Sequence, residues 1–228
     1  MIKKCCLSIL CIVLAIPAIA QEKQRLKDAT GVVKEVLDSK DGIPRTTLNS
    51  AICMVVFPNV KKISAGVGVT YGRGVLACRA GLKAGGAWSA PAMYSLDAGS
   101  IGPQFGGSST DYVGLVMTEA AADKILSGKW KLGADVGAYL GNSGATTQGL
   151  NDASLGAEIV IYARANGGVF AGASVGNSSI ESDDKANREL YGRSITASEI
   201  VRDGKVSVPD SAQSFLAALP TADVSQTN

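Results

Sequence analysis

The chain has 228 residues, no histidine and a nearly balanced charge, with 22 basic and 20 acidic residues. So close a balance excludes the overall basic field with which many proteins attract nucleic acid. The missing histidine removes the usual general base of hydrolases and the commonest transition-metal ligand. About 200 residues bury enough surface for one domain to fold without a metal or a disulfide framework.

The first twenty residues are typical of a secretory signal peptide. Lys3 and Lys4 form a short positive region, an apolar run covers residues 7–14, and an A-x-A cleavage signal follows Pro17. The apolar run is too short to cross a bilayer core of ~30 Å as a helix. We therefore expect cleavage after Ala20, export to the periplasm or beyond the cell, and equal numbers of basic and acidic residues in the mature chain. An uncleaved membrane anchor is the alternative.

Two of the five cysteines, Cys53 and Cys78, remain once the signal peptide is removed. In an oxidising compartment two such cysteines can pair, and closing this loop would contribute about 3 kcal/mol. The alternative is that both are small buried apolar residues. The sequence leaves both readings open.

Helices are predicted near both ends of the mature chain. Residues 21–40 place apolar side chains at helical spacing, which predicts an amphipathic helix, and Pro44 opens a short helix through Asn49. Capping residues predict the others. These are a helix from Thr118 to Gly128, one opened by the capping box of Thr196 and Glu199, and one from Pro209 to Pro220.

Between these helices the sequence is rich in β-branched residues and glycine. Residues 63–71 alternate with a period of two, which predicts a strand, and Gly72-Arg73-Gly74 predicts a tight connection to an antiparallel partner. Further strands are predicted at 87–96, 111–117, 131–140, 155–165 and 168–175, with an Asn-Gly hairpin turn at 165–168.

The fold class predicted from these elements is α+β. We expect a single domain over residues 21–220, built as a curved antiparallel β sandwich or flattened barrel with N-terminal helices and short C-terminal helices. Glycines within the strands favour such curvature. Residues 221–228 are polar and predict a disordered tail.

Two short motifs imitate catalytic sites. Ser174 stands in G-x-S-x-G, the pattern of the hydrolase nucleophile elbow, and Ser182–Lys185 reads S-x-x-K. An elbow serine needs a base and a following helix, but the chain has no histidine and Ser174 runs into a Gly-Asn turn. The second motif lacks its partner motifs and lies in a polar connection, where Asp183 and Asp184 are expected to be solvated. We therefore predict no enzyme activity, no metal site and no cofactor.

Two ordered series of residues resemble the SYLF lipid-binding domain family. One runs from Trp88-Ser-Ala-Pro91 through Gly99, Gly102, Gln104 and Gly106 to Thr110-Asp111. The other contains Tyr162, Arg164, Gly167, Phe170, Gly172, Ser174, Gly176, Asn187 and Tyr191-Gly192. Earlier segments, among them VFPNV and GVTYGRG, agree with the N-terminal half of the family, so the resemblance covers roughly residues 30–220. It implies that Ser174 occupies a structural position in a strand.

The resemblance implies lipid binding without catalysis. Eukaryotic members bind phosphoinositide membranes and some bind actin, through an amphipathic N-terminal segment and a basic surface. Because this chain begins with a signal peptide, we expect an exported bacterial member whose ligand is an anionic phospholipid or another envelope amphiphile. The alternative is a structural or interaction protein of the cell envelope with a protein partner and no lipid specificity.

The candidate lipid contacts are Lys61, Lys62, Arg79, Lys83 and Trp88. With a turn at Arg73, the returning strand would bring Arg79 and Lys83 back to the lysine pair and leave Arg73 at the far end. Each basic group near an anionic membrane is worth about 1 kcal/mol. Two alternatives remain open, because these charges could be scattered over the surface and Trp88 could be a core anchor.

Overall fold

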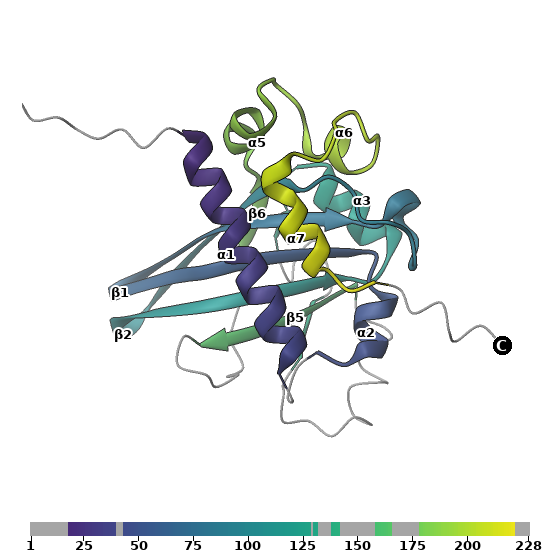
Figure 1. Cartoon of the computed structure of the whole chain (residues 1–228). Helices are drawn as coiled ribbons and strands as arrows, with labels where there is room; N and C mark the ends of the chain where they lie inside the picture. Colours follow the sequence, from purple (N-terminus) through teal and green to yellow (C-terminus); the bar gives the residue numbers. More distant parts are fainter. Residues whose placement is uncertain are drawn as a thin grey trace, which may run out of the picture.

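The computed structural model describes residues 18–39, 43–128, 130–131, 138–141, 158–165 and 178–221. It confirms the α+β class, with a curled, mostly antiparallel sheet and helices packed against it (Figure 1). The helices are α1 (Ala18–Asp38), α2 (Arg45–Ser50), α3 (Glu119–Leu126), α5 (Asp184–Tyr191), α6 (Ala197–Val201) and α7 (Gln213–Ala218). The strands are β1 (Cys53–Cys78), β2 (Ala92–Val116), β3 (Trp130–Lys131), β4 (Ala138–Gly141), β5 (Ile159–Ala165) and β6 (Ser179–Ser182).

The sheet is built around one long hairpin of β1 and β2. The two strands pair antiparallel from Cys53–Val116 to Leu76–Ala92. The predicted turn at 72–74 is wrong, because these residues lie inside β1, and the strands predicted at 87–96 and 111–117 are both parts of β2. The chain bends instead at Gly66, where φ is +79° and the pairing register shifts. Glycine adopts such a φ without steric cost, which explains why the bend falls there.

This bend lays the second half of β1 against the first. A Cβ atom at Gly72 would lie only 2.7 Å from the Val60 side chain, so the two halves approach too closely for a larger residue at position 72. We call β1 with its two adjacent halves the doubled strand, and the end opposite the bend at Gly66 its base. At this base, the Cα atoms of Cys53 and Cys78 are 3.9 Å apart and the two sulfurs form a disulfide. The bridge therefore joins the two ends of β1.

The two halves of β2 recruit different neighbours. Residues 110–116 pair with β5, and residues 94–97 pair with β6. β6 in turn pairs with β3, and β4 joins β5 as the parallel pair of the sheet. The predicted strands at 131–140 and 155–165 correspond in part to β3, β4 and β5.

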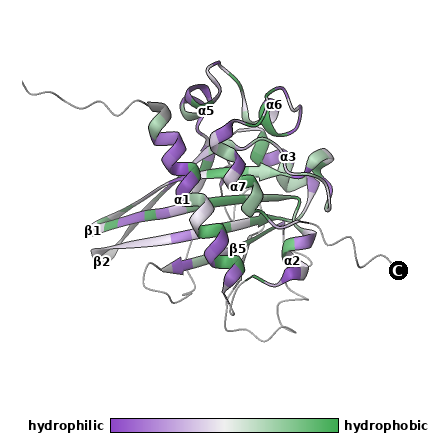
Figure 2. Ribbon diagram, in the orientation of Figure 1, coloured by the Kyte–Doolittle hydropathy of each residue, from purple (hydrophilic) through white to green (hydrophobic). Residues whose placement is uncertain are grey.

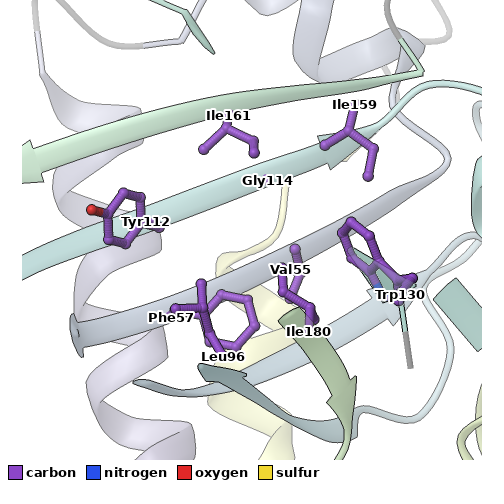
Figure 3. Close-up of a pocket in the computed structure, with 9 residues that line it drawn as sticks. All are labelled: Val55, Phe57, Leu96, Tyr112, Gly114, Trp130, Ile159, Ile161 and Ile180. Atoms are coloured by element: carbon purple, nitrogen blue, oxygen red, sulfur yellow. The ribbon is translucent and has the colours of Figure 1, made fainter. Parts of the chain in front are cut away.

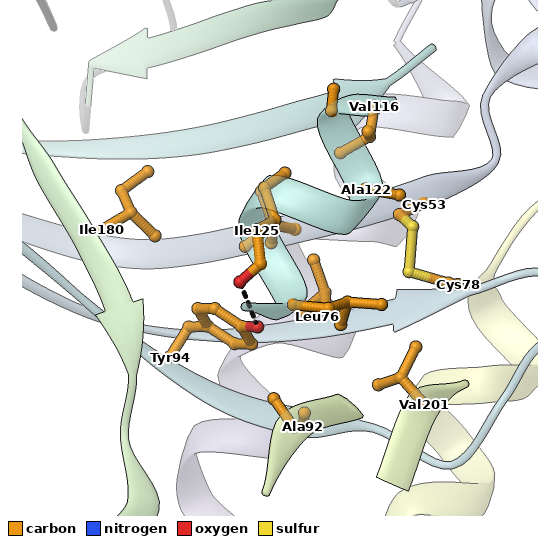
Figure 4. Close-up of a cluster of buried hydrophobic side chains, with 14 of the residues drawn as sticks. Cys53, Leu76, Cys78, Ala92, Tyr94, Val116, Ala122, Ile125, Ile180 and Val201 are labelled. Atoms are coloured by element: carbon orange, nitrogen blue, oxygen red, sulfur yellow. Dashed lines mark hydrogen bonds between the residues drawn. A yellow bond between two sulfur atoms is a disulfide. The ribbon is translucent and has the colours of Figure 1, made fainter. Parts of the chain in front are cut away.

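The curled sheet has an outer face and an inner face, each with its own core. α1 crosses the outer face of β1, β2 and β5, with α7 beside it (Figure 1), and buries Leu26, Val33 and Val36. The inner face packs against α3 and α6 around the disulfide (Figure 4). There the Tyr94 hydroxyl donates a hydrogen bond of 3.0 Å to the carbonyl of Ile125, and burial raises the pKa of Tyr94.

Local capping signals predicted the helix starts well. The Thr118 side chain accepts a hydrogen bond from the Ala121 N–H, and Thr196 forms the predicted capping box. The segment expected to be a polar connection is instead the start of α5, where Asp183 accepts from the Ala186 N–H. The same Asp183 carboxylate lies 3.0 Å from the Arg25 guanidinium of α1, so it is an ion-pair partner and not a solvated turn residue.

Several predictions fall outside the described residues. These are Ser174, the turn at 165–168, the strand at 168–175, residues 1–17 of the predicted signal peptide and residues 222–228 of the predicted tail. Within the described part of the chain, no helix combines the length and the apolar character needed to cross a membrane.

We expect the disulfide to be a principal stabiliser of the fold. Replacing Cys53 and Cys78 with alanine should lower the free energy of unfolding by about 3 kcal/mol, because the bridge constrains the unfolded chain between them. Urea denaturation followed by circular dichroism measures this change. A reductant should destabilise the wild-type protein to a similar extent and leave the double variant unchanged. A wild-type protein that is equally stable with and without reductant would contradict this role.

Candidate functional site

The bent end of the hairpin projects past α1 as an arm, formed by residues 61–73 of β1 and 97–109 of β2 (Figure 1). Large apolar side chains are exposed on it. They are Ile63 (70% exposed), Val67 (63%), Val69 (61%), Tyr71 (43%) and Phe105 (85%). Folding leaves these apolar side chains in water, and a group of large exposed apolar residues on one element usually marks a site of interaction.

The close packing of β1 on itself explains why these side chains point outward. The alternation predicted at 63–71 is present, but the set of residues on the inner face is small or polar. It includes Ser64, Gly68 and Gly72, all of which are buried. Because successive side chains of a strand point to opposite faces, a glycine-rich inner face leaves the valines, Ile63 and Tyr71 on the outer one. Figure 2 shows hydrophobic segments at the free end of the arm next to hydrophilic ones.

Basic residues flank the exposed apolar set. Lys61 is exposed, and its ammonium group donates a hydrogen bond of 2.9 Å to the hydroxyl of Ser109 on the paired strand. At the other end, the Arg73 guanidinium lies 5.8 Å from the centre of the Tyr71 ring and donates to the Tyr71 hydroxyl. Apolar side chains between cations form the pattern of surfaces that lie at a membrane interface.

The predicted cluster of four basic residues is wrong. Because β1 continues through 72–74, Arg79 lies at the base of the doubled strand, and its N–H donates to the Ile52 carbonyl at 2.7 Å. Lys61 and Lys62 lie in the arm, so the lysine pair is separated from Arg79 and Lys83 by the length of the half-strand. Lys83 is exposed near that base.

Arg79 is an internal residue, with only 2% of its surface exposed. Its guanidinium donates to the carbonyls of Ala51 (3.3 Å), Gly86 (2.9 Å) and Pro220 (3.0 Å), and burial lowers its pKa. It stacks over the Trp88 ring at 4.3 Å, and the indole N–H donates to the Pro220 carbonyl at 2.9 Å. Arg79 and Trp88 together therefore anchor the C-terminal segment. Trp88 thus has the anchoring role that the sequence analysis gave as the alternative to lipid contact.

The charged end of α1 is also bound within the fold. Arg25 lies 3.0 Å from Glu22 and 3.0 Å from Asp183, and both Arg25 and Glu22 are buried. Burial raises the pKa of the Glu22 carboxyl. Together with the buried apolar side of the helix, this network fixes α1 to the sheet and to α5.

Comparison with known proteins identifies the family. Residues 97–222 match the family described as "Ysc84: Las17-binding protein actin regulator". The chain belongs to this Ysc84 family. The match confirms the SYLF resemblance, and it begins in the arm, so that Phe105 lies within it and the lysine pair of β1 lies before it. Among the described residues, this Ysc84-family chain has no group of histidine, cysteine, aspartate or glutamate side chains that could hold a metal.

The curated relatives of this Ysc84-family chain are yeast proteins. Protein YSC84 of Saccharomyces cerevisiae is 33% identical over 150 residues, which cover 65% of this chain and 31% of the relative. LAS seventeen-binding protein 3 of the same species is 32% identical over 140 residues, covering 60% and 30%. An SH3 domain-containing protein of Schizosaccharomyces pombe is 29% identical over 182 residues, covering 78% and 41%. The chain thus spans well under half the length of these relatives.

The contrast between Arg79 and Lys83 is testable. Replacing Arg79 with methionine should lower the free energy of unfolding by about 2 kcal/mol, because it leaves buried carbonyls without a donor. Replacing Lys83 with glutamine should change it by less than about 0.5 kcal/mol, as expected of an exposed residue. Thermal and urea denaturation measure both. Equal effects of the two substitutions would contradict the internal role of Arg79.

Proposed function

We propose that this Ysc84-family chain is a non-catalytic lipid-binding protein that docks on membranes containing anionic lipid through the outer face of its arm. The exposed apolar set on the arm is the observation that carries the proposal. Burying one Val, Ile or Phe side chain contributes about 1.5–3 kcal/mol, whereas one basic group near an anionic surface contributes about 1 kcal/mol. The apolar side chains therefore supply most of the affinity, and Lys61 and Arg73 select an anionic surface.

A protein partner is the second candidate function. The family description names Las17 binding and actin regulation, and one relative is named for binding LAS seventeen. An exposed apolar patch also serves protein contacts. The cations at both ends of the patch favour the membrane, because they complement lipid head groups while the apolar set enters the layer beneath. Vesicle binding by the purified protein separates the two candidates, since it needs no other protein.

Substitutions on the arm test membrane docking. Replacing Phe105 and Val69 with serine should reduce binding to vesicles of phosphatidylglycerol and phosphatidylcholine by roughly a hundredfold, since both side chains lose their burial in lipid. Flotation of vesicles on a density gradient measures the bound fraction. The unfolding free energy should not fall, because both side chains are exposed in the free protein.

The exposed Lys83, at the base of the doubled strand, supplies the matched control. Replacing Lys83 with glutamine should leave flotation unchanged, whereas Lys61→Gln should weaken it about fivefold at low salt, with a smaller effect at high salt. A folded Phe105→Ser, Val69→Ser variant that floats as well as the wild-type protein would exclude the outer face of the arm as the docking surface.

We further propose that the protein is exported, which makes an envelope lipid its ligand. The predicted signal peptide supports this. Cleavage after Ala20 would remove only the first three residues of α1 and leave the Glu22–Arg25 contact in the mature chain. The intact mass of the exported protein should correspond to a chain that begins at Gln21. A mass that includes Met1, or that includes a lipid modification, would contradict the proposed processing.

A further inference from the structure

Within the described residues, the inner face of the sheet has no room for a lipid chain. It encloses an apolar cavity whose walls include Val55, Phe57 and Trp130 (Figure 3), but the volume of this cavity is only about 20 Å³. Such a volume admits about one water molecule. A lipid that contacts this part of the chain must therefore bind from outside, at an open surface such as the arm.

The arm has an open hollow of about 250 Å³ beside Phe105. Its lining consists of Lys62, Ser64, Phe105, Gly106, Gly107 and Ser108. Of these six residues Lys62 alone is charged, so the hollow is positive. A Cβ atom at Gly106 would meet no other atom within 4 Å, so the missing side chain leaves the hollow open. An open hollow of positive charge is suited to an anion.

The register of the hairpin brings three donor groups to this hollow. Lys62 pairs with Ser108, and Ser64 pairs with Gly106. Because alternate residues of a strand share a face, the side chains of Lys62, Ser64 and Ser108 lie on the same face as neighbours. Ser64 is only 8% exposed, and it reaches solvent where it lines the hollow. One ammonium group and two hydroxyls can thus donate hydrogen bonds to a single ligand.

The two neighbouring lysines differ in their contacts. Lys61 lies on the outer face, where its ammonium group donates to the Ser109 hydroxyl at 2.9 Å. Lys62 is partly buried beside the hollow, and within the described residues no carboxylate forms an ion pair with it. The charge of Lys62 is therefore available to an anionic ligand.

We propose that this hollow binds the phosphate of a phosphomonoester head group through Lys62, Ser64 and Ser108. A phosphomonoester carries a charge of about −1.5 to −2 at pH 7 and three acceptor oxygens, which match the three donor groups. A phosphodiester has one oxygen fewer for them and a lower charge. The proposal rests on the membrane docking proposed above and adds head-group specificity to it, since Phe105 of the docking surface also lines the hollow. A soluble phosphate monoester shares this chemistry.

Vesicles of matched zeta potential test the specificity. In flotation, the wild-type protein should bind about fivefold more tightly to vesicles of phosphatidic acid, a monoester, and phosphatidylcholine than to those of phosphatidylglycerol, a diester, and phosphatidylcholine. Lys62→Gln should abolish this preference, whereas Lys61→Gln should weaken binding to both kinds of vesicle alike. Ser108→Ala should reduce the preference without destabilising the fold, because Ser108 is exposed.

Soluble esters test the hollow without a membrane. Methyl phosphate should shift the amide NMR signals of Gly106, Gly107 and Ser108, and dimethyl phosphate at the same ionic strength should shift them far less. Lys62→Gln should weaken the binding of methyl phosphate at least about fivefold, since a hydrogen-bonded ion pair is lost. Lys61→Gln should leave this binding unchanged.

Two results would overturn the phosphate site. One is the absence of amide shifts with methyl phosphate, and the other is an equal effect of the Lys61 and Lys62 substitutions on its binding. Flotation keeps the two proposals distinguishable. Flotation without amide shifts retains membrane docking and excludes the phosphate site, whereas amide shifts without flotation exclude docking and retain the site. Amide shifts without a preference between the two kinds of vesicle assign the hollow to soluble esters in place of lipid.

Discussion

The close approach of the two halves of β1 is the constraint on which the rest of the structure depends. The bend at Gly66 turns one long strand back along itself, and glycine at position 72 lets the halves meet without a side chain between them. The Cys53–Cys78 bridge closes the other end of the same doubled strand. Because β2 pairs with β1 along almost its whole length, it bends as well, and its two halves pair with β5 and β6 along its other edge. The curled sheet is thus a consequence of one folded hairpin.

The same constraint decides which residues are available for binding. Only small side chains fit on the inner face of the arm. The large apolar residues of the alternating segment 63–71 therefore point outward, past the end of α1. Nearer the base, where α3 and α6 fill the space, the inner face carries large residues such as Phe57 and Leu96.

Local rules predicted what local interactions decide. Thr118 and Thr196 cap their helices as expected, because a cap depends on residues within one turn. The strand at 63–71 was also predictable from its period of two. What the period could not give is which face would be buried, since that depends on the distant second half of the same strand.

The errors share one physical cause, which is contact between residues far apart in the sequence. Gly72 and Gly74 predicted a turn, but glycine stands at position 72 because the Val60 side chain packs against it and leaves no room for a Cβ atom. Arg79 was predicted to be a surface cation, but its guanidinium donates hydrogen bonds to the carbonyls of Ala51 and Pro220. One of these residues lies before Arg79 in the chain and the other lies far after it. Once the turn was misplaced, the predicted cluster with the lysine pair followed from it. Lys61 and Lys62 lie in the arm as expected, because their position does not depend on that turn.

The edge of the arm also bears on the nature of its partner. Along β2, among the residues that the structure describes, pairing with β6 ends at Asp97 and pairing with β5 begins at Thr110, so the described partner of residues 98–109 is β1. This stretch contains Pro103 and four glycines, which make a poor template for an added strand. A partner that extends the sheet would find few favourable contacts there. A lipid layer needs no backbone register and requires only that the apolar side chains leave water. An arm with an apolar outer face and a glycine-rich stretch of β2 is therefore better suited to a fluid apolar surface than to another β-strand.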